Sequence, residues 1–253
     1  MADEALFVAD GDALEPTEWA VGPWSADALQ ASAYGGLLVR ALERTPVPAD
    51  MMIARLSFDL WRPVTREPIT TAVTVLREGR KAQTLEASLL QAGKPVARCT
   101  GVFLKADVAS TPPTAPLAPP AQGPDAGRPL PLHVKGWSPF FTGVDTRVVA
   151  GDLLEPGPAS AWFHLTRPLV LGEENSPLVH ATSAAASRAA PRPSSTSGPG
   201  ASSTPISRWC SGACRARPGS SSPRRRTRAI GGPAWRTACS RISTDPSGAA
   251  SRR

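Results

Sequence analysis

The sequence predicts an α+β fold in which one helix packs against an antiparallel sheet. An amphipathic stripe with helical spacing comes first, formed by Tyr34, Leu37, Leu38, Ala41 and Leu42. Four strand-like runs joined by short turns follow it, which is typical of neighbouring antiparallel strands rather than of strands separated by helices. Beyond residue 186 the chain has no Leu, Val, Phe, Met or Tyr, so the predicted fold depends on the residues before that point.

A glycine pair, Gly35-Gly36, lies within the predicted helix. Glycine has no Cβ, so the pair lets another backbone or a ligand come close. Two roles follow. Either the pair binds substrate, beside a CoA group or a thioester carbonyl, or it allows close packing of the helix, which is the more common role. Pro46 and Pro48 predict the end of the helix, and Ser25 is a candidate cap at its start.

The strands are predicted from alternating and β-branched patterns. Ala54, Leu56, Phe58 and Leu60 share one face of a half-buried strand. The three other runs cover residues 70–77, 83–90 and 96–104, with turns at residues 79–80 and 92–94.

A second, shorter unit is predicted after a proline-rich linker. Residues 108–132 contain eight prolines and few large apolar side chains, as linkers do. Strand patterns follow at residues 147–150 and 161–165. Ser176-Pro177 predicts the start of a helix that continues to Ala186. Residues 165–169 repeat the pattern of residues 60–64, which hints at an internal repeat.

Charge divides the chain at residue 187. Segment 187–253 holds 13 Arg, no Lys and one acidic residue, a formal +12. The preceding part holds 15 basic and 20 acidic residues, a formal −5, so the net +7 of the chain comes from the tail. Three isoleucines are the only large aliphatic side chains of the tail, which cannot bury enough apolar surface to offset chain entropy. We predict that the tail is disordered.

Metal, membrane and specific nucleic-acid binding are not expected. The tail cysteines Cys210, Cys214 and Cys239 lack the paired spacing and fourth ligand of a zinc site, and Cys99 lies in an apolar run as a core residue does. No apolar run approaches the ~20 residues of a membrane span, and the acidic N-terminus has no signal-peptide pattern, so we expect a cytoplasmic protein. The arginine run at residues 224–228 has few aromatic neighbours, which disfavours a single-strand binding platform.

Several stretches resemble one family. "GPWSADAL", "ARLSFDLWRPV" and "TVLREGRKAQTLEASLLQAGKPVARCTGVFLK" are similar to the first hotdog of the double-hotdog acyl-CoA thioesterases of the thioesterase II kind. "GDLLEPGPASAWFHLTRPLVLGEENSPLVHATSAAA" is similar to the start of their second hotdog. The resemblance implies a hotdog fold, a helix wrapped by antiparallel sheet, with the second hotdog incomplete. It divides the chain into a hotdog domain (15–106), a linker (107–133), a truncated second hotdog (134–186) and the basic tail (187–253).

The same resemblance implies the chemistry. Family members hydrolyse acyl-CoA to free acid and CoA, without a cofactor, through a water activated by an Asp, a Thr and a Gln of the second hotdog. No catalytic residue is intact here, because Ala186 stands where the Asp is expected. We therefore expect an acyl-CoA partner but negligible activity, and the family pattern allows a homo-oligomer through the hotdog sheet. The alternative is a non-catalytic module that binds acyl-CoA or dimerises. A hotdog dehydratase is disfavoured, since no Asp and His flank Gly35.

The tail has the composition of GC-rich codons read out of frame. Shifted by one base, serine codons of the TCN type become NTC, which encodes Phe, Leu, Ile or Val, and the tail has 15 serines. Residues 202–209 then permit Val-Asn-Ala-Asp-Leu-Thr-Val, which resembles a strand of the second hotdog. Residues 242–252 permit a stretch similar to the family's last strand with its Gln. Loss of one A in the codons for residues 185–188 explains the change, since restoring it gives Ala-Asp-Phe-Ala with the Asp at position 186.

Other polar and aromatic candidates have simpler interpretations. Asp59 lies opposite the apolar stripe of its strand, so we expect it to be solvated rather than catalytic. Trp61 and Trp162 either line an acyl groove or pack. The three histidines fall on different predicted elements, so we expect surface or hydrogen-bonded roles for them: His133, His164 and His180.

Overall fold

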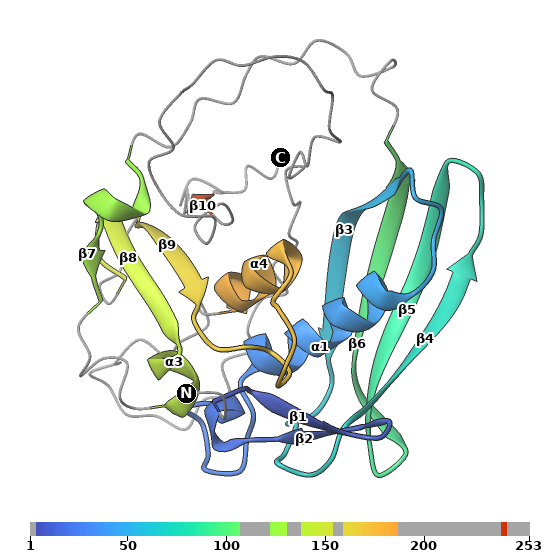
Figure 1. The fold of residues 1–253 in the computed structure, drawn as a ribbon, viewed down its shortest axis with the longest axis horizontal. Coiled ribbons are helices and arrows are strands. Elements are labelled where there is room, and N and C mark those ends of the chain that lie inside the picture. Colours follow the sequence, from blue (N-terminus) through green and yellow to red (C-terminus); the bar gives the residue numbers. More distant parts are fainter. Residues whose placement is uncertain (1–3, 107–121, 131–137, 154–158, 187–238, 242–253) are drawn as a thin grey trace, which may run out of the picture.

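The computed structural model describes residues 4–106, 122–130, 138–153, 159–186 and 239–241. It has two halves, each with a four-stranded sheet and a helix, and the two helices lie side by side between the sheets (Figure 1). The first half contains β1 (Phe7–Asp10), β2 (Ala13–Pro16), α1 (Ala31–Arg44), β3 (Met51–Leu60), β4 (Thr70–Arg77), β5 (Ala82–Gln91) and β6 (Lys94–Lys105). The second contains β7 (Arg128–Pro129), α3 (Pro139–Thr142), β8 (Val144–Ala150), β9 (Ser160–Leu165), α4 (Pro177–Ala186) and β10 (Cys239–Arg241).

The first sheet has the order β3-β6-β5-β4, with every neighbouring pair antiparallel. The four predicted strands and their order along the chain are confirmed. At the turn between β5 and β6, Ala92 and Gly93 have φ values of 48° and 72°. Positive φ at both central residues is what a tight two-residue hairpin requires, and it matches the right-handed twist of the strands.

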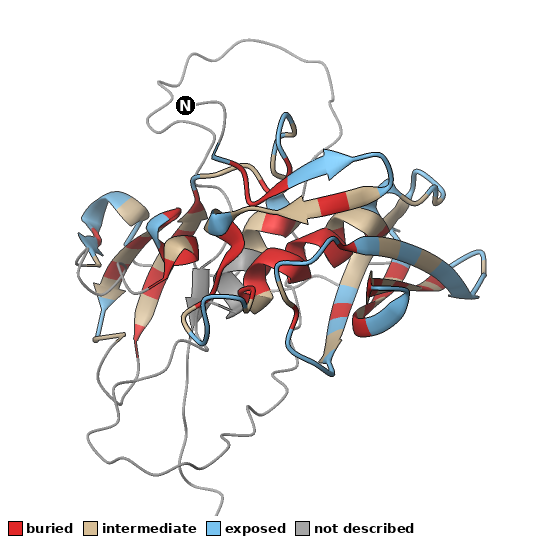
Figure 2. Ribbon diagram, turned by 90° about the horizontal axis from the view of Figure 1, so that it is seen from below, coloured by how far each residue is buried: buried red, intermediate tan, exposed pale blue. Residues whose placement is uncertain are grey.

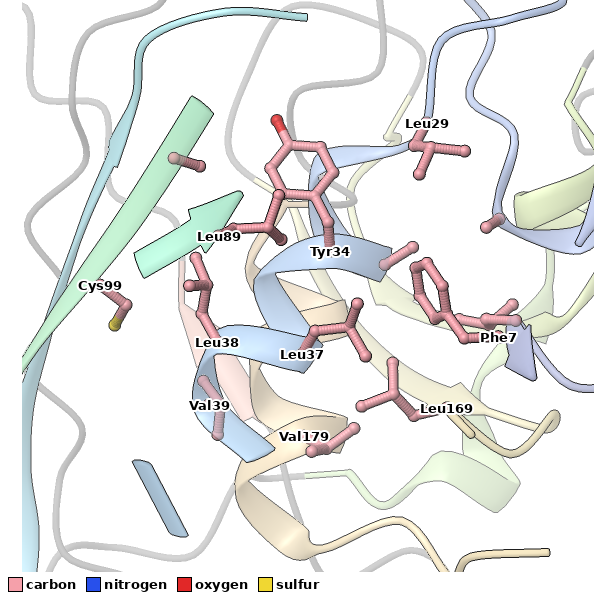
Figure 3. Close-up of a cluster of buried hydrophobic side chains, with 14 of the residues drawn as sticks. Phe7, Leu29, Tyr34, Leu37, Leu38, Val39, Leu89, Cys99, Leu169 and Val179 are labelled. Carbon is pink, nitrogen blue, oxygen red and sulfur yellow. The ribbon is translucent and has the colours of Figure 1, made fainter. Parts of the chain in front are cut away.

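Helix α1 lies against the inner face of this sheet. Leu85, Ala87 and Leu89 alternate along β5 and are fully buried, while the residues between them are only half-buried. Figure 3 shows Leu38 of α1 pointing toward Leu89 and Cys99. Nine of the fourteen residues of α1 are buried, so the helix is covered on more sides than the one face that the sequence stripe predicts (Figure 2).

The helix begins later than its candidate cap. Gln30 is the N-cap residue of α1 and makes no side-chain capping bond. Ser25 closes a local turn instead, since its Oγ accepts a hydrogen bond from the Asp27 N–H at 3.3 Å. The prediction that Ser25 caps the helix is wrong because the intervening residues are held extended, with bridges from Val21 to Leu29 and from Ala28 to residue 65.

The second half also departs from its sequence prediction in part. The strands at residues 147–150 and 161–165 and the helix to Ala186 are confirmed. Arg128, inside the predicted linker, pairs with Val148 of β8, so the end of that linker belongs to the sheet. In the tail predicted to be disordered, Cys239 pairs with Trp162 of β9. Those three residues of β10 depart from the prediction, and the rest of the tail lies outside the described residues.

A hairpin that the sequence did not predict connects the two halves. β1 and β2 begin ahead of residue 15, the predicted domain start. The N–H of Phe7 donates to the carbonyl of Leu169 at 3.0 Å, and the N–H of Leu171 donates to the carbonyl of Phe7 at 2.9 Å. The internal repeat lies in the order of the elements, since two strands followed by a helix occur as β1, β2 and α1 in the first half and as β8, β9 and α4 in the second. The similar stretches 60–64 and 165–169 occupy different places, since one follows α1 and the other precedes α4.

Candidate functional site

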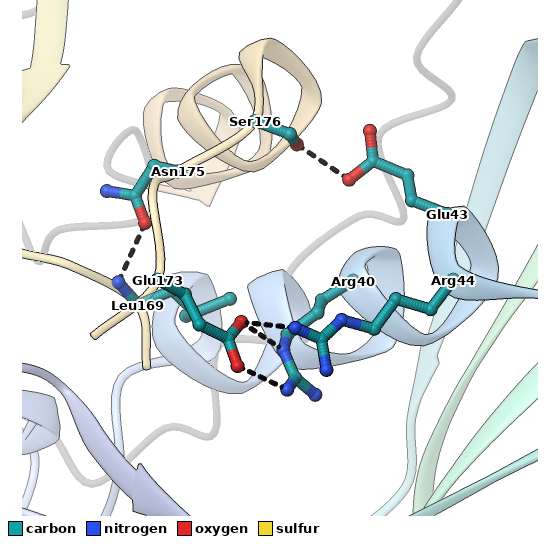
Figure 4. Close-up of polar contacts among 7 residues, drawn as sticks. All are labelled: Arg40, Glu43, Arg44, Leu169, Glu173, Asn175 and Ser176. Carbon is teal, nitrogen blue, oxygen red and sulfur yellow. Dashed lines mark hydrogen bonds and ion pairs between the residues drawn. The ribbon is translucent and has the colours of Figure 1, made fainter. Parts of the chain in front are cut away.

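Helices α1 and α4 run antiparallel across the centre of the molecule. A Cβ on Gly35 would lie 3.4 Å from Thr182 Cγ2 of α4. Nearer the other end of α1, Ser176 donates a hydrogen bond to Glu43 at 2.6 Å (Figure 4). Residue numbers thus rise on one helix as they fall on the other. Because both helices rise by the same amount per residue, Ala186 at the end of α4 is level with the first turn of α1.

The glycine pair lies at the crossing of the two helices. A Cβ on Gly36 would lie 2.9 Å from Leu169 Cδ1, closer than side chains tolerate, and Gly35 faces Thr182. These are packing contacts, and they agree with the simpler of the two sequence interpretations. Substrate binding by Gly35 and Gly36 remains a prediction.

Two polar side chains are buried at the first turn of α1. Gln30 is 3% exposed and Ser32 is fully buried. Within the described residues, neither Gln30 Oε1 nor Ser32 Oγ has a hydrogen-bond partner. Each such group costs about 1 to 3 kcal/mol when unpaired. The Ser32 hydroxyl can donate a hydrogen bond to a carbonyl oxygen placed at the positive end of the helix dipole, whereas Gln30 Oε1 can only accept one. In sequence, Gln30-Ala31-Ser32 stands where many members of the resembled family carry His-Gly-Gly, and that departure gave no role to either side chain.

A charged pocket of about 380 Å³ lies at the other end of the helix pair. Arg40 and Arg44 of α1 both bond the carboxylate of Glu173 (Figure 4). The Arg40 hydrogen bond, with the charges of both arginines, lowers the pKa of Glu173. Burial raises the pKa of Glu43, and the hydrogen bond from Ser176 opposes that change. The pocket therefore holds fixed charges of both signs at the junction of the two halves.

His164 and His180 stack on each other between β9 and α4. Their ring centroids lie 4.9 Å apart with 18° between the planes. The predicted positions of these histidines on a strand and on a helix are confirmed, and the packing of β9 against α4 brings their rings together. Burial, together with the charge of the neighbouring His164, lowers the pKa of His180 to about 4. Burial also lowers the pKa of His164, although the charge of Asp145 opposes this.

This histidine pair predicts loss of stability in mild acid. Below the ordinary pKa of 6.5 the unfolded chain takes up a proton that folded His180 does not, so stability falls as pH decreases from 6.5 toward about 4 and then levels off. After allowance for partial solvent exposure, we expect a loss of about 1 kcal/mol between pH ~7 and pH ~5. Urea unfolding at the two pH values measures it. His180→Gln should remove most of the difference, and an unchanged difference would contradict the assignment.

The remaining sequence candidates have structural roles. Asp59 forms an ion pair with Arg98 at 2.7 Å on the outer face of the first sheet, where Trp61 is 49% exposed beneath the guanidinium. Trp162 donates to a backbone carbonyl. Cys99 is a buried thiol whose pKa burial raises to about 12, as expected for a core residue. His133, Cys210 and Cys214 lie outside the described residues.

The described residues contain neither a metal-binding cluster nor a membrane-spanning helix. In the ranges that the structure describes, no three His, Cys, Asp or Glu side chains gather in a way that could hold a metal. In the same ranges, no helix has the length and apolar character to cross a membrane.

Comparison with known proteins identifies the first half. Residues 20–104 match the family model of the acyl-CoA thioesterase N-terminal domain. This stretch is similar to that domain, and it contains α1 and nearly all of the first sheet, including the buried residues at the start of α1. No functionally curated protein matches the chain in sequence.

Two solved structures are similar to this chain. A putative thioesterase II from Thermobifida fusca YX has a TM-score of 0.54 and 18% identity, over 74% of this chain and 71% of that one. A hot dog fold protein of unknown function from Alicyclobacillus acidocaldarius has a TM-score of 0.48 and 16% identity, over 64% of this chain. This chain covers 61% of the Alicyclobacillus protein, so it spans less than two thirds of that relative. The predicted α+β hotdog fold is confirmed.

Proposed function

We propose that this chain is a thioesterase by descent that binds acyl-CoA and, with alanine at position 186, hydrolyses it negligibly. The observation that carries the proposal is the antiparallel matching of α1 and α4, which brings Ala186 level with the buried polar turn at Gln30 and Ser32. The thioesterase family of residues 20–104 supports the choice of ligand.

The chemistry of a thioester accounts for this choice of site. In hydrolysis a water oxygen attacks the carbonyl carbon, negative charge develops on the carbonyl oxygen, and the C–S bond breaks as a proton reaches the leaving thiolate. Backbone N–H groups of the first turn of α1 and the Ser32 hydroxyl can stabilise that oxygen. A carboxylate at position 186 would orient and deprotonate the water. The methyl group of Ala186 cannot, so the proposed site retains binding without the base.

The proposal extends to the organisation of the chain. The first hotdog corresponds to residues 15–106 with the β1-β2 hairpin added, and the second is cut short after residue 186 by the change of reading frame. The Thr and Gln of the family mechanism would be encoded only in the restored reading frame, and the tail of this chain contains no Gln. A cytoplasmic location and self-association through the hotdog sheet belong to the same proposal. If residues 187–253 are the natural sequence of the tail, Ala186 favours the alternative function, which is a non-catalytic module that binds acyl-CoA or dimerises.

Binding without turnover is the expected result for the purified full chain. Octanoyl-CoA binding is measured by isothermal titration calorimetry, and thiol release is measured separately with a chromogenic disulfide. Ser32→Ala removes a buried hydroxyl that has no partner, so the fold should not lose stability, while octanoyl-CoA should bind about fivefold to tenfold more weakly. Ser88→Ala, on the outer face of β5, is the matched control.

Each outcome of this experiment has a clear meaning. Turnover well above the buffer rate would overturn the predicted inactivity. Absence of binding, or equal affinities of the Ser32→Ala and Ser88→Ala variants, would overturn the proposed site.

A further inference from the structure

The charged pocket at the C-terminal end of α1 is related to the proposed thioester site by the internal repeat. Ala186 is the tenth residue of α4, and Arg40 is the tenth residue of α1. The antiparallel matching that brings Ala186 level with the first turn of α1 brings Arg40 level with the first turn of α4. The pocket therefore occupies the twofold-related position, with an arginine where the family's site has its acid.

The side chains of this pocket are complementary to a carboxylate. Arg40 donates to both oxygens of Glu173, from Nε at 2.7 Å and from Nη2 at 2.6 Å. Arg44 adds a contact to the same carboxylate at 2.9 Å. Paired N–H groups of a guanidinium match the two oxygens of a carboxylate in this geometry. Arg40 is held in place, since its side chain is 16% exposed.

The rest of the pocket favours a small amphipathic anion. Leu169 and Val179, each 3% exposed, contribute the apolar side chains of its mainly polar lining. Glu43 and Glu174 also line it, and Glu43 already accepts a hydrogen bond from Ser176. These carboxylates oppose a ligand with several negative charges, such as a phosphate, more than a ligand with one. Glu173 is carried by a surface turn at Gly172, whose φ is 79°, and is itself 29% exposed.

We propose that this pocket binds a short-chain carboxylate, whose head group replaces the Glu173 carboxylate on Arg40 and Arg44 while its alkyl chain contacts Leu169 and Val179. Glu173 acts as an internal competitor that swings out with its turn. Such a ligand belongs to the chemical class that thioester hydrolysis releases, and this last link rests on the proposed function. The binding itself does not depend on it.

Hexanoate titrated into the full chain tests the proposal by calorimetry. Glu173→Gln keeps the size of the side chain but removes the competing charge, so hexanoate should bind about tenfold more tightly than to the unmodified chain. The matched control is Glu86→Gln, which removes the acid of another arginine pair, Arg98–Glu86, on the first sheet. This control should bind hexanoate as the unmodified chain does.

A second variant makes the outcome decisive. Arg40→Gln, added to the Glu173→Gln chain, should abolish the gain in hexanoate affinity, because it removes the guanidinium that binds the carboxylate. The two glutamine amides can pair with each other, so the fold should be preserved. If Glu173→Gln does not fold, Glu173→Asp replaces it, since the shorter carboxylate cannot reach both arginines, and tighter hexanoate binding is again expected. Equal hexanoate affinity of the unmodified and Glu173 variants, or binding that survives Arg40→Gln, would overturn the proposal. Octanoyl-CoA binding and its Ser32 dependence are measured separately, so the two proposals fail independently.

Discussion

Insertion of one adenine into the codons for residues 185–188 is expected to convert this chain, in which we expect negligible activity, into an acyl-CoA thioesterase. The insertion restores a carboxylate at position 186, level with the first turn of α1, and replaces a tail without large apolar side chains by strand-like sequence. General acid–base groups contribute about 10²- to 10⁴-fold to rate. We expect kcat/KM for octanoyl-CoA to rise by at least about 10²-fold over the present chain, measured as thiol release.

The matched control for this experiment is the frame-restored chain that keeps Ala186. It has the same restored tail but lacks the carboxylate, so it should bind octanoyl-CoA and turn it over no faster than the present chain. Ala186→Asp in the present chain should also stay inactive, because the tail still contains no Gln and so cannot supply the Gln of the family mechanism. A frame-restored chain no more active than its Ala186 control would contradict both the frame hypothesis and the assignment of position 186.

Leu37→Ala is expected to give the largest loss of stability from a single substitution. Leu37 is fully buried on α1, and Figure 3 shows it pointing toward Phe7 and Leu169, which come from β1 and from the segment before α4. Truncation leaves a cavity where the two halves meet. Leucine-to-alanine changes at such sites cost about 2 to 5 kcal/mol, so we expect a loss of about 3 kcal/mol in the free energy of unfolding, measured by urea titration with circular dichroism.

An exposed leucine provides the control for this measurement. Leu76 on β4 is 53% exposed, so Leu76→Ala should change the free energy of unfolding by less than about 0.5 kcal/mol. A small and equal effect of the two substitutions would mean that α1 does not pack against the second half as described.

The sequence by itself determined the elements whose signals are local. The helical spacing from Tyr34 to Leu42, the alternation along β3 and the turn at residues 92–94 all depend on residues a few positions apart. So does the start of α4, where the Ser176 hydroxyl accepts a hydrogen bond from the Val179 N–H. The family resemblance of the first half also rests on such local order, and the family model confirms it.

Only the tertiary structure decided which distant residues meet. Phe7 pairs with Leu169, Arg40 with Glu173, and His164 stacks on His180, and no local pattern records these choices. The burial of Gln30 and Ser32 is likewise a result of the packed chain, since neither polar residue type predicts a buried side chain. Packing between segments more than a hundred residues apart depends on the shapes of both surfaces together, so the candidate site emerged from the fold rather than from the residues around it.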